Sequence, residues 1–231
     1  MCFSADVSVG TALALLPAGA YCLEAAWRKD RAYLPLATVP VLFGVQQLCE
    51  GRVWAALDAG HLDLARGPSL AFLFFAFVVW PVGIPAAVAA VESGTRSRVF
   101  LAVAGVGAVV AAGYYLPIAA DGGRGLNPAA VGHSIRYDLS AVPAANGWFW
   151  LTLYLVTVSG PLLASRNGRL RPMGAAVMAA AAVSYVLFEY AFASVWCFFA
   201  AVLSLYLSYV FYRLPGPSGL RAGTGASSGA R

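Results

Sequence analysis

Apolar positions dominate the chain in long runs that short polar segments separate. A membrane-spanning helix needs about 20 mostly apolar residues. The last two runs nearly touch, and one helix over both would be about 60 Å long, twice the hydrocarbon thickness, so we expect a reversal near Ala193 and Ser194. The pattern predicts an all-α, heptahelical integral membrane bundle. Its seven runs are Val7–Trp27, Leu34–Ala56, Leu70–Val91, Val99–Ile118, Trp148–Leu163, Met173–Phe192 and Val195–Tyr212.

Composition supports membrane insertion. The chain is 61% hydrophobic and 11% charged, with a mean hydropathy of +0.75, whereas soluble domains carry roughly 25% charged residues. A soluble globular protein is thereby excluded, and the lipid bilayer is the expected partner. The net charge of +5 is explained by membrane orientation, so nucleic acid is not an expected partner.

Basic residues cluster on one side of the predicted spans. Because such residues favour the cytoplasmic side, we expect the N-terminus outside and the C-terminus in the cytoplasm. Met1–Asp6 has no basic residue, so no cleavable signal peptide is expected. The excess of arginine over lysine suggests a bacterial inner (cytoplasmic) membrane. The predicted cytoplasmic residues are Arg28, Lys29, Arg31, Arg96, Arg98, Arg166, Arg169, Arg171, Arg213, Arg221 and Arg231, against Arg52, Arg66, Arg124 and Arg136 on the other side.

The sequence predicts one transmembrane domain, 1–214, followed by a tail, 215–231. The tail is rich in Gly, Ser and Ala, so we expect it to be disordered and cytoplasmic. The one long loop, 119–147, should lie outside. Within it, His133–Leu139 alternates apolar and polar residues as a short strand does. Long loops with internal structure often act as lids, and we expect this one to fold over the outer mouth.

Two segments of the chain resemble each other. Glu50 and Glu189 follow predicted cytoplasmic arginines at similar spacing, and Phe74-Phe75-Ala76 matches Phe198-Phe199-Ala200. This favours two parallel three-helix units joined by the fourth helix, a 3+1+3 arrangement known in transporters. The alternative is a chance match in a chain rich in alanine and phenylalanine.

Polar side chains share one face of the second predicted helix. Gln46, Glu50 and Trp54 are spaced i, i+4 and i+8, and Gln47 precedes Glu50 by one turn. In a bilayer this face must point into the bundle. It predicts a polar pocket or a proton-linked site, because a carboxylate at membrane depth is costly and usually functional. The alternative is hydrogen bonding between helices alone.

A second candidate carboxylate lies near the outer end of the sixth helix. Glu189 is flanked by Tyr185 and Tyr190. If it faces Glu50, the pair can hold a proton or a cation. Alternatively, Glu189 lies at the membrane interface, or Arg52 or Arg136 neutralises one of the two.

Aromatic residues and prolines gather in the third predicted helix. Trp80 precedes Pro81, which with Pro85 should kink this helix. The aromatic side chains either line a ligand pocket or pack against lipid and core. They are Phe72, Phe74, Phe75, Phe77 and Trp80.

Cysteines offer a weak metal or disulfide signal. Cys2 and Cys197 are both expected near the outer surface, where they either form a disulfide or join His133 as metal ligands. No C-x-x-C or H-x-x-x-H motif occurs. A buried cysteine is most often a small apolar side chain.

Three motifs together resemble an uncharacterised family of bacterial multi-pass membrane proteins. They are Met1-Cys2-Phe3-Ser4-Ala5, Gln46-Gln47-x-x-Glu50-Gly51-x-x-Trp54 and Phe75-Ala76-x-x-x-Trp80-Pro81-x-x-x-Pro85. The resemblance covers most of the chain and implies importance for these residues without supplying a reaction. The architecture also looks like heptahelical transporters and receptors, by analogy only.

The leading hypothesis is binding, and transport, of a small polar molecule or ion at an outer-facing pocket. The sequence does not identify a cofactor. One alternative is a membrane-embedded hydrolase or metalloenzyme with Glu50 as base, and another is a sensor or assembly subunit whose polar face binds a partner. Gly105, Gly107 and Gly113 permit close helix packing, either within the chain or in a homo-oligomer. The ligand-binding candidates are Gln46, Gln47, Glu50, Trp54, Trp80, Tyr185 and Glu189.

Overall fold

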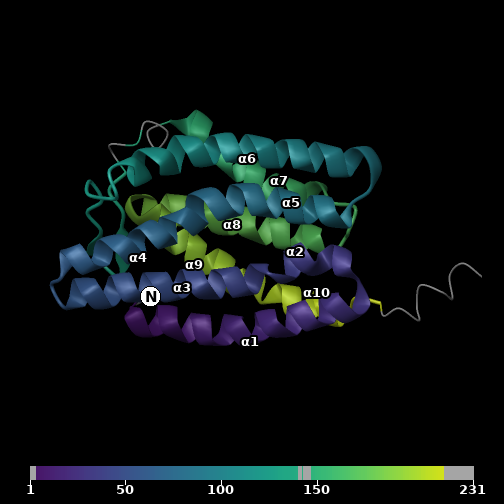
Figure 1. The fold of residues 1–231 in the computed structure, drawn as a ribbon, viewed down its shortest axis with the longest axis horizontal. Coiled ribbons are helices and arrows are strands. Elements are labelled where there is room, and N and C mark those ends of the chain that lie inside the picture. Colours follow the sequence, from purple (N-terminus) through teal and green to yellow (C-terminus); the bar gives the residue numbers. More distant parts are fainter. Residues whose placement is uncertain (1–3, 140–141, 143–146, 216–231) are drawn as a thin grey trace, which may run out of the picture.

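The chain folds into a bundle of long helices with a two-stranded hairpin at one end (Figure 1). This computed structural model describes residues 4–139, 142 and 147–215. The tail prediction therefore falls, except for Pro215, outside the described residues. The all-α class is confirmed. The helices are α1 (Ala5–Lys29), η1 (Arg31–Tyr33), α2 (Leu34–Ala37), α3 (Val39–Asp58), α4 (Leu62–Phe74), η2 (Phe75–Val79), α5 (Trp80–Val91), α6 (Gly94–Ala120), α7 (Trp148–Ala164), α8 (Leu170–Phe188), η4 (Glu189–Ala191), α9 (Phe192–Ser204) and α10 (Tyr206–Tyr212).

Within the described residues, five helical stretches are long and apolar enough to cross a membrane. The protein is accordingly a multi-pass membrane protein. The helix Trp148–Ala164 is apolar but shorter, and the last stretch joins the two final predicted spans. The five stretches are Ala5–Lys29, Arg31–Asp58, Leu62–Val91, Gly94–Ala120 and Leu170–Tyr212.

One predicted boundary is wrong and another is slightly displaced. The third span begins at Leu62 rather than Leu70, because Arg66 pairs with Asp63 on the exposed surface and Pro68 is accommodated inside the helix. The break in the last stretch falls at Glu189–Ala191, just before the predicted reversal. There α8 ends, and α9 packs back against it.

The helices contact one another in the same order in both halves of the chain (Figure 1). In the first half α1 packs against α3 and α3 against α4, while in the second half α7 packs against α8 and α8 against α9. The halves meet where α5 touches α7, where α10 touches α1 and where α3 touches α9. The long α6 packs mainly against α5. The contacts therefore form a closed ring, with α6 added outside it.

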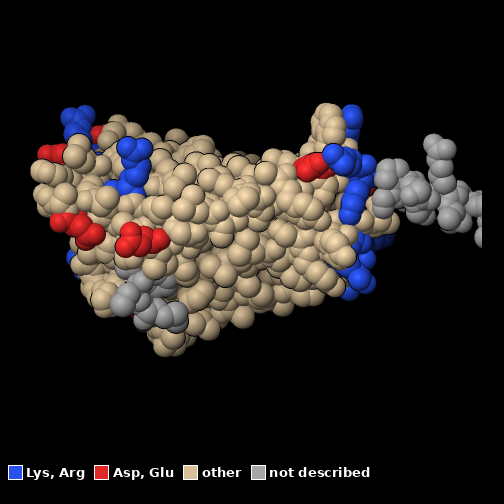
Figure 2. All heavy atoms as spheres, turned by 90° about the horizontal axis from the view of Figure 1, so that it is seen from below, with Lys and Arg blue, Asp and Glu red and all other residues tan. Residues whose placement is uncertain are grey.

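Charged side chains gather at the two ends of the bundle, and the band between them in Figure 2 is uncharged. This is the surface that a bilayer requires. The arginine-rich end carries Arg28, Lys29, Arg31, Arg96, Arg98, Arg166, Arg169, Arg171 and Arg213. At this end Lys29 Nζ donates to the carbonyls of Phe211 and Tyr212, 2.8 and 3.1 Å away, which joins the ends of α1 and α10.

The opposite, or hairpin, end carries the long loop. In it β1 (Ala129–Val131) pairs antiparallel with β2 (Ser134–Arg136) across a turn at Gly132, whose φ of +60° suits glycine. The short strand predicted from the alternation in His133–Leu139 is thus confirmed. Strand β2 packs against α9 and η4, and β1 against α3. The fully buried Ile135 anchors the hairpin in the bundle.

Close packing of α6 on α5 depends on Gly107. A Cβ there would overlap the carbonyl oxygen of Pro81, whereas a Cβ at Gly105 meets nothing within 4 Å. We predict that Gly107→Ala destabilises the folded protein by about 1–3 kcal/mol through overpacking. Gly105→Ala, on the same helix, should be neutral or slightly stabilising because alanine favours helix. Thermal unfolding in detergent measures both, and equal midpoints would contradict this packing.

Candidate functional site

The polar face predicted on α3 does point into the bundle. Gln46 and Gln47 are fully buried and Glu50 is 2% exposed. Trp54, one turn further on, is also buried. The face is thus enclosed by this chain's own helices, so it offers no surface to the partner protein that a sensor or assembly subunit would need there.

Glu50 is held by two donors from different helices. Ser194 Oγ of α9 donates to Oε1 at 2.5 Å, and Gln47 Nε2 donates to Oε2 at 3.3 Å. Among the described residues no Lys, Arg or His nitrogen lies within 4 Å of this carboxylate. Neutralisation by Arg52 or Arg136 is therefore not seen, and both of these residues are exposed. The carboxylate relies on neutral donors, one from each half of the chain.

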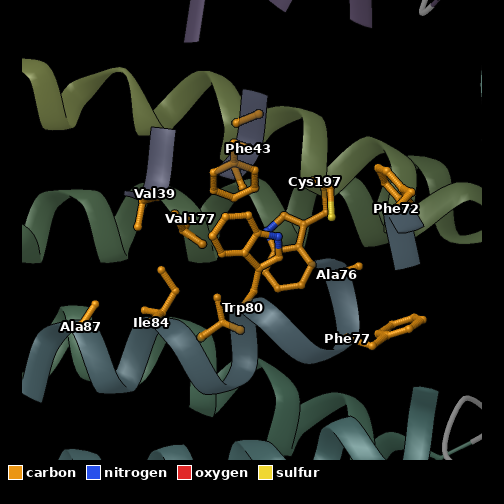
Figure 3. Close-up of a cluster of buried hydrophobic side chains, with 14 of the residues drawn as sticks. Val39, Phe43, Phe72, Ala76, Phe77, Trp80, Ile84, Ala87, Val177 and Cys197 are labelled. Atoms are coloured by element: carbon orange, nitrogen blue, oxygen red, sulfur yellow. The ribbon is translucent and has the colours of Figure 1, made fainter. Parts of the chain in front are cut away.

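Gln46 links the same face to α5. Trp80 Nε1 donates to Gln46 Oε1 at 2.8 Å, and Gln46 Nε2 donates weakly to the Phe72 carbonyl at 3.5 Å. The Trp80 ring stacks on Phe43, with centroids 3.8 Å apart, and Figure 3 shows it reaching toward α3 and Cys197. The Cys197 thiol lies within hydrogen-bond reach of the Gln46 amide. The Gln46 amide thus connects α3 to three other helices, α4, α5 and α9.

A π-helical turn, η2, places these aromatic residues. In this turn the backbone N–H of Trp80 donates a hydrogen bond to the carbonyl of Phe75 instead of the carbonyl of Ala76. The next residue, Pro81, has no N–H, so the Ala76 carbonyl loses both its α and its π partner. The Tyr154 hydroxyl of α7 donates to it at 2.5 Å. The sequence Trp80-Pro81 therefore produces a local break that α7 satisfies.

Beside this break lies a pocket of about 510 Å³. This volume is in the range of small-molecule sites. The polar face of α3 does not line it, but Cys197, which touches Gln46, does. The pocket and the Glu50 site are therefore neighbours separated by side chains. The aromatic residues of its wall are Phe77, Tyr114, Tyr137, Trp148, Tyr154, Tyr185, Tyr190, Phe192 and Trp196.

The hairpin loop covers this pocket. Ile135, Tyr137 and Leu139 all line it. Tyr137 stacks on Phe72 of α4, with ring centroids 5.2 Å apart, and is only 7% exposed. Burial, and next the Glu50 charge, hold the pKa of Tyr137 well above its usual value, so its hydroxyl stays protonated. That hydroxyl has no hydrogen-bond partner among the described residues.

Glu189 and Tyr185 lie at the pocket, away from Glu50. The Tyr185 hydroxyl donates to Glu189 Oε1 at 3.2 Å, and Glu189 is exposed in η4. The hypothesis that the two glutamates face each other is wrong for this structure. Helix α8 ends before Glu189, so α9 turns back and presents Ser194 to Glu50 instead. The interfacial interpretation of Glu189 fits better.

Of the weak metal candidates, the structure describes His133 and Cys197. Cys2 lies outside the described residues, His133 is exposed in the hairpin turn, and Cys197 is buried in α9. Among the described residues no group of three or more His, Cys, Asp or Glu side chains could hold a metal ion. A metalloenzyme therefore gains no support from this geometry.

Sequence reasoning missed several residues of the site. Ser194 and Trp196 lie where only a reversal was predicted, and Tyr154 lies in an ordinary apolar run. Tyr137 carried a signal, because the predicted alternation already placed it on the same face as Ile135. No comparable signal identified Ser194, since a single serine in an apolar helix is common.

The buried Tyr137 gives a direct test of the loop's packing. Tyr137→Phe keeps the stack on Phe72 and removes a buried hydroxyl that has no partner among the described residues, so we predict no loss of stability and a gain of up to about 1–3 kcal/mol. Tyr137→Ala should cost about 3–5 kcal/mol by leaving a cavity. Unfolding midpoints in detergent measure both. A phenylalanine variant as unstable as the alanine variant would show that the hydroxyl is bonded.

Comparison with known proteins identifies a family. No curated protein matches the chain, and no solved structure matches it. A family of unknown function, in contrast, matches residues 1–219, which covers the whole described bundle. This agrees with the family resemblance seen in the sequence motifs. The chain belongs to the family of unknown function DUF6629.

Proposed function

We propose that this protein binds a small polar molecule or ion in the pocket beneath the hairpin loop. The observation that carries the proposal is a cavity of about 510 Å³ whose wall comes from both halves of the chain and whose cover is a structured loop. Concave sites of this size with a few polar groups are the usual form of ligand sites. The loop acts as the lid.

The pocket faces outward in this proposal. Its lining includes the exposed Trp148, Glu189 and Tyr190, which stand at its mouth at the hairpin end. The arginine-rich end lies opposite and is assigned to the cytoplasm by the positive-inside rule. This orientation puts the N-terminus outside and the C-terminus inside, and it corresponds to a bacterial inner membrane.

Seven crossings and a parallel repeat belong to the same proposal. The apolar stretch Leu170–Tyr212 is broken at η4, which supports counting it as two crossings, and α7 supplies another. The matching order of helix contacts in the two halves supports two three-helix units joined by α6. Sites between such repeats are typical of transporters.

Transport is the second part of the proposal. Two helix breaks border the pocket: η2 contributes Ala76 and Phe77 to its wall, and η4 contributes Glu189, Tyr190 and Ala191. Discontinuous helices at a substrate site are a recurrent feature of secondary transporters. In this proposal the Glu50 site does not contact the ligand but supports the pocket wall. Ser194 on α9 and Cys197 beside Gln46 connect this site to the wall.

The Glu50 site thereby changes role from the one expected from sequence. Gln46, Gln47, Glu50, Trp54 and Trp80 do not line the pocket. They support the wall, whereas Tyr185 and Glu189 contact the ligand directly.

A pocket-filling variant tests binding. Ala193 lines the pocket, whereas Ala182 is exposed on α8 and is not among the lining residues. We predict that compounds from a library of polar metabolites stabilise the wild type and Ala182→Trp but not Ala193→Trp. Thermal-shift measurement in detergent reads this out, since ligand at 100 times its Kd adds about 2.7 kcal/mol.

The outcomes are distinct. Stabilisation lost only in Ala193→Trp supports binding in this pocket. A library with no stabilising compound, or equal stabilisation of all three proteins, contradicts the proposal. Ligand-free unfolding midpoints of both tryptophan variants show whether they are folded.

A further inference from the structure

The pocket carries a negative electrostatic bias. Among the described residues that line it there is no Lys, Arg or His side chain, and the one carboxylate is that of Glu189. Glu189 accepts a hydrogen bond from Tyr185, and neither of the two ion pairs found among the described residues includes it. The carboxylate at the mouth therefore has no cationic partner among the described residues.

The aromatic rings of the wall form a continuous series that ends beside this carboxylate. Successive ring centroids are 6.3, 5.3, 5.2, 6.1 and 5.3 Å apart. Tyr185, near the end of the series, is the residue that bonds Glu189. Aromatic faces are electron-rich and attract cations within about 6 Å of their centroids. The rings in order are Tyr114, Tyr154, Trp196, Phe192, Tyr185 and Trp148.

We propose that the pocket takes an organic cation, a quaternary or protonated amine, with its charge between Glu189 and the aromatic wall. This inference rests on the proposed binding function and names its ligand class. Weakly hydrated ammonium groups suit such a wall because they lose little water on leaving solvent for aromatic faces. Anions would meet a carboxylate and the negative faces of the rings.

Inorganic cations fit the lining less well. Calcium takes six to eight oxygen ligands and magnesium prefers an octahedral set. The described lining, in contrast, offers one carboxylate, Glu189, and is otherwise mostly aromatic or aliphatic. The volume of about 510 Å³ leaves room for an apolar or aromatic substituent on the ammonium. Amines carrying such a group are the expected class.

Matched probes separate charge from shape. Choline and the uncharged 3,3-dimethylbutan-1-ol have nearly the same shape, and benzyltrimethylammonium adds an aromatic group. We predict by isothermal titration calorimetry of the full chain in detergent that both cations bind, the larger one more tightly. The neutral alcohol should bind at least about tenfold more weakly than choline.

Matched variants locate the charge. Glu189→Gln should weaken cation binding about tenfold and leave the neutral alcohol unchanged. Asp63→Asn, which removes a carboxylate at the same end of the bundle but outside the pocket, should change neither. Trp148→Leu at the mouth should weaken cation binding, whereas Trp27→Leu on the exposed far end of α1 should not.

These measurements can contradict the cation inference without contradicting binding in the pocket. If the alcohol binds as well as choline, or if Glu189→Gln binds cations normally, the ligand is not recognised by its charge here. Should neutral or anionic metabolites stabilise the wild type but not Ala193→Trp, binding in the pocket stands and the cation class fails. If no compound binds, both proposals fail.

Discussion

A carboxylate enclosed by apolar helices must find its donors within the protein, because lipid supplies none. Glu50 meets this constraint with Gln47 from its own helix and Ser194 from α9 in the other half of the chain. Losing the donors of a buried charged group costs more than an ordinary hydrogen bond gains. This contact therefore helps to fix α9 against α3, together with the contact of Cys197 with Gln46, and α9 contributes four residues to the pocket wall.

The neighbouring contacts follow the same rule. Trp80 reaches Gln46, and Tyr154 satisfies the Ala76 carbonyl that the π-turn and Pro81 leave without a partner. Each of these bonds crosses between helices, and the second joins two residues of the pocket wall. Polar groups that would be costly in lipid thus fix the positions of the aromatic residues that form the wall.

Much of this could be predicted from the sequence. Apolar runs located the helices, and the i, i+4, i+8 spacing placed Gln46, Glu50 and Trp54 on an inward face. The sequence left open whether Glu50 faces Glu189, because local spacing says nothing about where a helix ends and the chain turns. Ser194 and Tyr137 were missed as site residues because their importance arises from contacts distant in sequence.

The bond between Glu50 and Ser194 joins the two halves of the chain, and a double-mutant cycle measures its strength directly. The variants are Glu50→Leu, Ser194→Ala and their combination, with the free energy of unfolding of each compared with that of the wild type. We expect a coupling of about 1 kcal/mol, because bonds between membrane helices average about 0.6 and charged acceptors strengthen them. Strictly additive effects would contradict the claim that this contact positions α9.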